Sequence, residues 1–86
     1  MAVLQFVAVM DLAISAYQRP LVVPHPGMAV RGFLDEVKRE GSELQKHPED
    51  YELHRLGEFD EDTGMIAPAV NGPVVLIRGK DAALSK

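Results

Sequence analysis

The three histidines are the side chains best suited to bind a metal ion or to exchange a proton near neutral pH. They are His25, His47 and His54, and no two of them are four residues apart, as helix-borne zinc ligands would be. The chain also has no cysteine that could complete a thiolate site. His25 and His47 each adjoin a proline and are predicted to lie in turns, and His54 is predicted to lie on one face of a strand. The sequence therefore predicts no metal site.

The other patterns that could support catalysis are incomplete. Ser15 and Ser42 lack the Gly-x-Ser-x-Gly context of an exposed nucleophile, and Ser42 is expected at the end of a helix. The acidic run 58–62 lacks the alternating ligands of a calcium loop and fits a turn instead. Gly79–Lys80 has no upstream glycine at the spacing of a phosphate-binding loop. We therefore predict no catalytic residues, no cofactor and no small-molecule substrate, so the protein is not expected to be an enzyme.

Length and charge narrow the class of protein further. The 86 residues suffice for a single domain, 1–86, with a thin core. The formal net charge of −4 provides no general attraction to phosphate groups. The apolar residues 1–10 are too few to span a bilayer and lack the basic start of a signal peptide, so we predict no membrane attachment. The lack of cysteine suits a reducing cytoplasm.

The first half of the chain predicts two strands and a helix. Residues 3–10 are apolar on both faces, which is typical of a strand covered on both sides. Residues 17–23 form a second strand in which Pro20 favours an edge or a bulge. Residues 28–39 form the helix, preceded by Pro26 as a candidate first helical residue. Its apolar stripe consists of Val30, Phe33, Leu34 and Val37. Two ion pairs are expected on its other faces, Arg31–Asp35 and Asp35–Arg39.

The second half of the chain predicts a hairpin and a final strand. After a polar loop over 43–50, residues 51–59 form a strand, with a turn at 60–64 and a returning strand at 65–67. Residues 74–77 form the last strand, and 79–86 are expected to be a frayed tail. Along 51–59, one predicted face carries Tyr51, Leu53, Gly57 and Phe59, and the other carries His54, Leu56 and Glu58.

These elements predict the α+β class: a small, mostly antiparallel sheet with one helix on one face, in the order β-β-α-β-β, with a fifth strand as an alternative. One helix covers one face of the sheet, yet strand 3–10 is apolar on both faces. A second copy of the chain would be the simplest cover for the other face. We therefore predict a homodimer.

The middle of the chain resembles a known family. The segment from Lys46 to Leu53 (Lys-His-Pro-Glu-Asp-Tyr-Glu-Leu), then 56–60 and Thr63–Gly64, resembles the signature of the small non-structural protein of gokushoviruses, the tailless single-stranded-DNA phages of the Microviridae. Upstream, Asp11, Tyr17, Arg19–Pro20, Pro24 and 29–37 also fit this pattern. Leu12, Ala13 and Ile14 depart from it, because the family often has charged residues there.

The resemblance implies a protein of the host bacterial cytoplasm that is absent from the virion and assists single-stranded DNA synthesis or packaging. Two hypotheses follow. In the first, the protein binds single-stranded DNA or the viral replication proteins. In the second, it is a protein-binding adaptor or regulatory homodimer that contacts a viral or host protein through its uncovered sheet face or its acidic hairpin, as its negative charge favours. The candidate nucleic-acid-binding residues of the first hypothesis are Tyr17, Arg19, Arg31, Lys46 and Tyr51. The alternative role for Arg31 is an ion pair with Asp35 within the helix.

Overall fold

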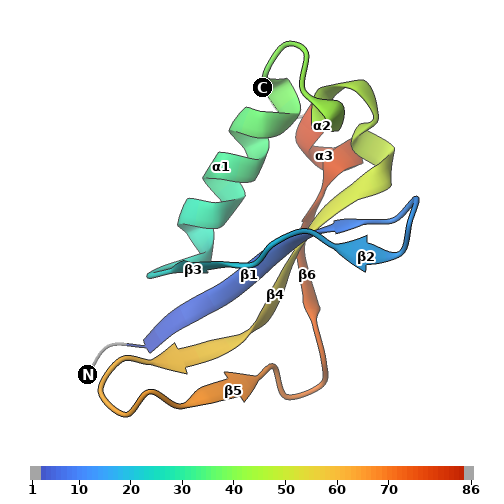
Figure 1. The fold of residues 1–86 in the computed structure, drawn as a ribbon. Helices are drawn as coiled ribbons and strands as arrows, with labels where there is room; N and C mark the ends of the chain where they lie inside the picture. The colour runs from blue at the N-terminus through green and yellow to red at the C-terminus, as the bar shows by residue number, and fades with distance from the viewer. Residues whose placement is uncertain (1–2, 85–86) are drawn as a thin grey trace.

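The computed structural model describes residues 3–84, which form a six-stranded antiparallel sheet with helices packed against it (Figure 1). The predicted α+β class with a mostly antiparallel sheet is confirmed. No helix within residues 3–84 is long and apolar enough to cross a membrane. The strands are β1 (Val3–Asp11), β2 (Ala16–Tyr17), β3 (Leu21–Val23), β4 (Tyr51–Asp60), β5 (Ile66–Pro68) and β6 (Val74–Arg78). The helices are α1 (Pro26–Lys38), α2 (Glu43–Lys46), the short 3-10 helix η1 (Pro48–Asp50) and α3 (Gly79–Leu84).

The sheet is built around the long pair β1 and β4. β2 and β3 pair with opposite ends of the outer side of β1, and β5 and β6 pair with opposite ends of the outer side of β4. Figure 1 shows the helices gathered around one end of the sheet, with the β4–β5 hairpin at the other end. The sheet therefore has one end covered by helices and one end without them.

The predicted strand 17–23 is divided in two by residues 18–20. Pro20 has no N–H group to donate to a neighbouring strand, so the ladder stops before it and resumes at Leu21. Gln18 still donates a backbone hydrogen bond of 2.8 Å to Val9. β2 and β3 are consequently short strands at the edge of the sheet, as the proline led us to expect.

A β-bulge in β4 changes which side chains share a face. Phe6 of β1 pairs with Gly57 and Val7 pairs with Arg55, so Leu56 has no partner on β1. Residues directly opposite each other share a face, so the side chains after the bulge exchange faces. The predicted faces of 51–59 are therefore correct before the bulge and wrong after it: Gly57 and Phe59 share the face of His54, and Glu58 shares the face of Leu53.

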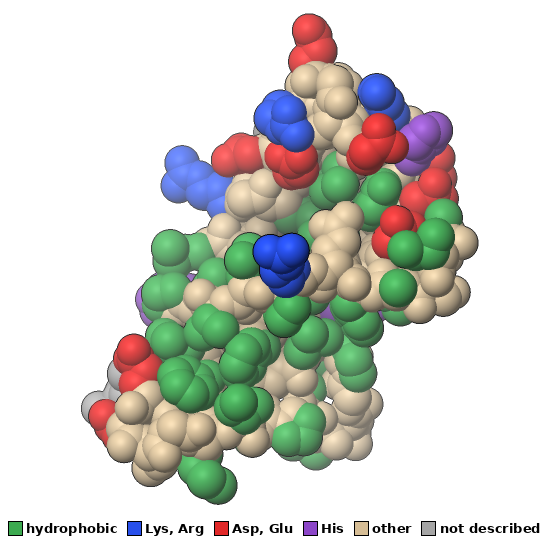
Figure 2. All heavy atoms as spheres, in the orientation of Figure 1, with side chains coloured by type: hydrophobic (Ala, Val, Ile, Leu, Met, Phe, Trp, Pro, Cys, Tyr) green, Lys and Arg blue, Asp and Glu red, His purple; other side chains and the backbone are tan. Residues whose placement is uncertain are grey.

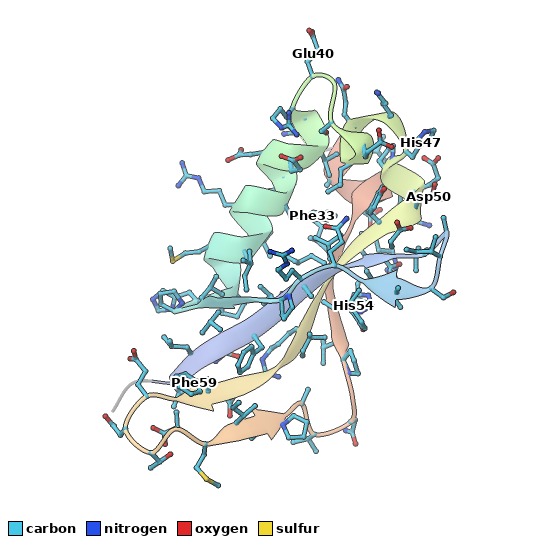
Figure 3. All side chains as sticks on the ribbon, in the orientation of Figure 1. Phe33, Glu40, His47, Asp50, His54 and Phe59 are labelled. Carbon is cyan, nitrogen blue, oxygen red and sulfur yellow. The ribbon has the colours of Figure 1, made fainter. Side chains whose placement is uncertain are left out.

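The core lies between α1 and one face of the sheet. Phe33 and Val37 of α1 are 4% and 3% exposed, which confirms the predicted apolar stripe, and Figure 3 shows Phe33 between the helix and the strands. Pro26 begins the helix, also as predicted. The buried core cluster consists of Val7, Phe33, Val37, Leu44, Tyr51, Leu53 and Ala82.

The opposite face of β1 is partly covered by its own neighbours in the sheet. Ala8 is 3% exposed and lies opposite His54 of β4, which Figure 3 places near the centre of the molecule. Phe6 packs edge-on against Phe59 with ring centroids 6.2 Å apart. These contacts within one chain reduce the need for a second copy over this face, so the predicted homodimer needs a different physical basis.

The C-terminal segment differs from the expected frayed tail. Residues 79–84 form α3, and Ala82 is fully buried against the core, so the prediction is wrong for these residues. Residues 85–86 lie outside the described residues. A Cβ atom at Gly79 would lie 2.0 Å from the carbonyl oxygen of Pro48, so only glycine allows α3 to begin this close to η1. Likewise, the predicted polar loop 43–50 contains α2 and η1.

Candidate functional site

The structure does not gather the five candidate nucleic-acid-binding residues into one site. Tyr17 lies on β2, with 39% of its surface exposed, and its hydroxyl is 2.8 Å from Nδ1 of His54. Lys46 ends α2, where its ammonium lies 3.7 Å from a carboxylate oxygen of Glu43. Arg19 and Arg31 are exposed and form no ion pair within residues 3–84. The expected ion pair between Arg31 and Asp35 is therefore absent from the described chain.

Tyr51 belongs to the core, which corrects its assignment as an exposed stacking side chain. It is 9% exposed and packs in the cluster under α1, α2 and α3. Burial raises the pKa of its phenol, and the nearby carboxylates of Asp11, Glu43 and Asp50 raise this pKa further. A nucleic-acid base could not stack on this ring without opening the core.

On the face drawn in Figure 2, basic and acidic side chains are mixed. Figure 2 shows Lys and Arg side chains among Asp and Glu side chains around the helices, whereas hydrophobic side chains gather over the other end of the face drawn. Arg39 illustrates this, because its guanidinium donates to Glu36 at 2.7 Å and lowers the pKa of that carboxyl. This pair replaces the predicted pair between Asp35 and Arg39. The face drawn in Figure 2 therefore lacks the basic patch expected of a general nucleic-acid binder.

A chain of polar side chains crosses the sheet on the face opposite α1. His54 contacts the hydroxyl of Tyr17 through Nδ1 and Oε1 of Glu52 through Nε2, each at 2.8 Å. The other carboxylate oxygen of Glu52 lies 3.3 Å from Nε of Arg78. The four residues come from β2, β4 and β6, so the chain connects three strands. Sequence reasoning missed it, because only the strand pairing brings Tyr17 and His54 together.

The geometry of this polar chain fits a structural link better than a catalytic centre. The side chains of His54 and Glu52 are 10% and 15% exposed, so their polar atoms are satisfied mainly by each other. The neighbouring cavity, of about 210 Å³, touches Glu52 and Arg78 but not His54 or Tyr17. This cavity therefore gives a substrate no contact with the imidazole.

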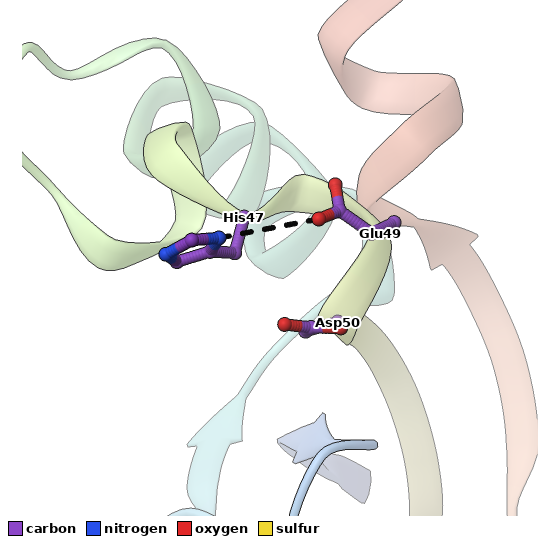
Figure 4. A group of neighbouring side chains, drawn as sticks. All are labelled: His47, Glu49 and Asp50. Atoms are coloured by element: carbon purple, nitrogen blue, oxygen red, sulfur yellow. Dashed lines mark ion pairs between the residues drawn. The ribbon is translucent and has the colours of Figure 1, made fainter.

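His47, Glu49 and Asp50 form a small group of potential metal ligands at η1 (Figure 4). One ligand atom from each lies within 4.8 Å of the others, and Nδ1 of His47 is 4.0 Å from Glu49. His47 and Glu49 are exposed, and within residues 3–84 no buried side-chain nitrogen or oxygen atom lacks a hydrogen-bond partner. Exposed groups of this kind are adequately explained by their own ion pair and by turn geometry, so we assign no metal site to them.

An open groove of about 670 Å³ lies between α1 and the sheet edge formed by β3. Phe33 and Val7 form part of its floor, and Leu21 and Met28 line it with 63% and 56% of their surfaces exposed. Large aliphatic side chains that remain this exposed at a concave surface are typical of a binding groove. The charged residues along it are Arg19, Glu36, Arg39 and Glu43.

Two of the α1 residues that line the groove are small and leave space beside them. Ala29 and Gly32 line it on the helix side, and a Cβ atom at Gly32 would meet no atom within 4 Å. A glycine inside a helix lowers its stability by about 0.5–1 kcal/mol relative to alanine. Gly32 therefore lowers the stability of α1, although no neighbouring atom requires a glycine at this position.

The fold and these surfaces define a small α+β protein with an open groove beside its main helix. The family model described as Phage ORF5 protein matches residues 4–82, which is nearly the whole chain. The chain therefore belongs to the phage ORF5 protein family. No curated protein and no solved structure matches it.

Proposed function

We propose that this phage protein is a non-catalytic accessory protein that acts by binding another protein through the groove beside α1. The observation that carries the proposal is the exposure of Leu21 and Met28 at the mouth of an apolar groove. The partner would present a short amphipathic segment whose aliphatic side chains contact Phe33 and Val7 on the groove floor. The acidic net charge of −4 favours a protein partner over a phosphate backbone.

The resemblance of residues 46–64 to the gokushovirus non-structural protein supports a more specific proposal. In that setting the partner is a protein of the phage or host replication machinery, and the complex assists single-stranded DNA synthesis or packaging in the host bacterial cytoplasm. The protein would act there as an adaptor and would be absent from the virion.

Complementation of a phage that lacks this gene tests the groove. The variant Gly32→Leu places an aliphatic side chain in the groove, where the added Cβ meets no atom within 4 Å, so the fold should be retained. We expect plaque formation to be lost. The matched control is Gly27→Leu, which is also on α1, has no atom within 4 Å of its added Cβ, and does not line the groove. Equal plaque numbers with both variants would contradict the groove as the functional surface.

Direct binding of single-stranded DNA is the second candidate. Arg19 and Arg31 favour it, because both are free of ion pairs within residues 3–84, and Tyr17 is 39% exposed as a residue. Fluorescence anisotropy with a labelled oligonucleotide would detect binding that weakens steeply with added salt, and Arg19→Gln with Arg31→Gln should reduce that salt dependence. No binding at low salt would eliminate this candidate.

A further inference from the structure

We propose that the segment bound in the groove beside α1 is an amphipathic α-helix of a different protein, about three turns long, with an aliphatic face and a carboxylate near Arg19. This inference rests on the proposed function, because it concerns the same groove. It goes further in giving the secondary structure of the bound segment, its length and its charge. Its basis is the shape of the groove, the short edge at β3 and the charges along the groove.

The groove follows α1 for most of the length of that helix. Its wall on the α1 side begins at Met28 and ends at Arg39, the C-cap residue, eleven residues further along the chain. At about 1.5 Å per residue, this wall is about 16 Å long, which is about three turns of a helix. Val7 and Leu53 of the sheet form part of the floor. A partner helix of about 11 residues therefore matches the groove in length.

The exposed side chain of Leu21 is directed to this side of the sheet. Leu21 pairs with Val7, which belongs to the core under α1. Residues directly opposite each other share a face of the sheet, so Leu21 projects on the α1 side. Met28 is exposed on the α1 wall of the same groove. The two exposed aliphatic side chains therefore belong to the two walls of the groove, and a helix lying between the walls would contact both.

An extended partner strand fits this surface poorly. A strand adds to a sheet through backbone hydrogen bonds with an exposed edge, and the edge at the groove is β3. β3 has three residues and lies between Pro20 and Pro24, neither of which has an N–H group to donate. An added strand would also continue the sheet beside β3, so it would not reach Gly32 on α1. A helix satisfies its own backbone groups and needs only the side-chain contacts that the groove offers.

Gly32 gives a partner helix room to approach α1. Met28, Gly32 and Glu36 are four residues apart, so they form one row along the surface of α1, and all three line the groove. The middle member of this row has no side chain, and a Cβ atom there would meet no atom within 4 Å. Packed helices interlock such rows, and smaller side chains at the contact bring the two axes closer. One large aliphatic side chain of the partner therefore fits over Gly32.

The helices of a second copy of this chain could not occupy the groove. The apolar stripe of α1 packs in its own core, where Phe33 and Val37 are buried. α2 and α3 have four and six residues, which is shorter than the groove, and they bury Leu44 and Ala82 in the same core. No helix within residues 3–84 therefore has a free apolar face three turns long, so the bound helix comes from another protein.

Arg19 determines the charge expected on the partner helix. Of the charged residues that line the groove, Glu36 and Arg39 pair with each other at 2.7 Å, and Glu43 lies 3.7 Å from Lys46. Arg19 is exposed and has no ion pair within residues 3–84. The net negative charge of the chain is screened over about 8 Å at physiological ionic strength, whereas a carboxylate in the groove would contact Arg19 directly. An acidic residue beside the aliphatic face therefore complements the groove.

The first test is a selection of peptide ligands, because a selection assumes neither the partner nor its conformation. A display library of random peptides of about 16 residues, enough for about four helical turns, is selected on the full chain. Each recovered peptide is then measured against Gly32→Leu and against the control Gly27→Leu, which does not line the groove. Peptides that bind in the groove should lose affinity for the first variant only.

These groove-dependent peptides should have the pattern of an amphipathic helix. We expect aliphatic residues at positions i, i+4 and i+7, with an acidic residue beside them. Circular dichroism should show a gain of helix when such a peptide binds, beyond the sum of the separate spectra. Aliphatic residues at alternate positions would indicate an added strand instead.

The second test concerns the charge at Arg19. Arg19→Glu should weaken the groove-dependent peptides by about fivefold, and changing the acidic residue of the peptide to lysine should restore binding to this variant. The matched control is Arg31→Glu, which makes the same change of charge at an exposed arginine of α1 that does not line the groove. It should change the affinity by less than about twofold, because the charge lies outside the contact and is screened.

Three results would overturn the inference. The first is a set of groove-dependent peptides that alternate in polarity or are rich in proline, with no gain of helix on binding. The second is an effect of Arg19→Glu no larger than that of Arg31→Glu. The third is the recovery of no peptide that distinguishes Gly32→Leu from Gly27→Leu.

The proposed function fails by a different result, which is equal plaque formation with Gly32→Leu and Gly27→Leu. Loss of plaques with Gly32→Leu, together with groove-dependent peptides that bind in an extended conformation, would keep the groove as the functional surface and reject only the helix.

Discussion

Ser42→Ala is expected to lower the free energy of unfolding by about 2 kcal/mol, a large effect for the removal of one oxygen atom. Ser42 is 2% exposed and lies between α1 and α2. Its hydroxyl donates a 2.6 Å hydrogen bond to the backbone carbonyl oxygen of Glu36 and accepts a 3.0 Å hydrogen bond from the backbone N–H of Gln45. One side chain therefore ends α1 and begins α2.

The magnitude follows from the two hydrogen bonds. Replacing a serine N-cap by alanine costs about 1 kcal/mol, because an N–H group of the first turn loses its acceptor. Loss of the second bond leaves the part-buried carbonyl of Glu36 without this donor, which costs about 1 kcal/mol more. Domains of this size lose roughly 4–8 °C of melting temperature per kcal/mol. The variant should therefore melt roughly 8–16 °C lower than the native chain.

Urea denaturation followed by circular dichroism would measure the difference, at one protein concentration so that self-association does not differ between samples. Ser42→Gly is the informative control, because glycine is tolerated at an N-cap at a cost of only a few tenths of a kcal/mol. It should therefore lose about 1 kcal/mol, mainly from the bond to Glu36. If both variants lost less than about 0.5 kcal/mol, the hydroxyl would not stabilise this junction, and the reasoning would be refuted.

Three further predictions concern single positions. Gly79→Ala should destabilise the fold by roughly 2–4 kcal/mol in the same urea titration, because the added Cβ would overlap the Pro48 carbonyl and displace α3. Gly32→Ala should raise the free energy of unfolding by about 0.5–1 kcal/mol, because the groove leaves room for its methyl group. The pKa of Tyr51 is raised above its ordinary value of 10.0 in the folded chain, so the unfolded chain ionises first. The contribution of Tyr51 should therefore be complete below about pH 10 and be lost as the pH rises through the raised pKa, and Tyr51→Phe should remove this part of the loss in stability measured at alkaline pH.

The parts of the fold that could be predicted from sequence are those that depend on local periodicity. The apolar run 3–10 becomes β1, and the stripe that includes Phe33 and Val37 becomes the buried side of α1. Pro20 and Pro26 act through their own backbone geometry, so their effects on a strand edge and on a helix start were also predictable. In each case, the cause and the structure lie within a few residues of each other.

The features that could not be predicted depend on contacts between distant segments. The bulge at Leu56 brings Gly57 against β5, where a Cβ would lie 2.3 Å from the carbonyl oxygen of Ala67. Nothing in the alternation of residues 51–59 indicates which residue has no partner on β1. Similarly, residues 79–84 have the composition of a charged tail, and they are ordered because Gly79 allows close approach to η1. Tyr17 and His54, 37 positions apart, come together only through strand pairing.

Contacts between distant segments of one chain also cover part of the sheet face that a second copy was expected to cover. The apolar second face of β1 suggested that a second copy must cover it, but within one chain Ala8 is already 3% exposed opposite His54. A dimer that covered this face would also have to enclose the polar side chains of Glu52 and Arg78. Removing charged groups from water costs free energy unless new hydrogen-bond partners take the place of the water. Substitutions of Ala8 that leave the strand intact should therefore have little effect on the mass of the protein measured by analytical ultracentrifugation.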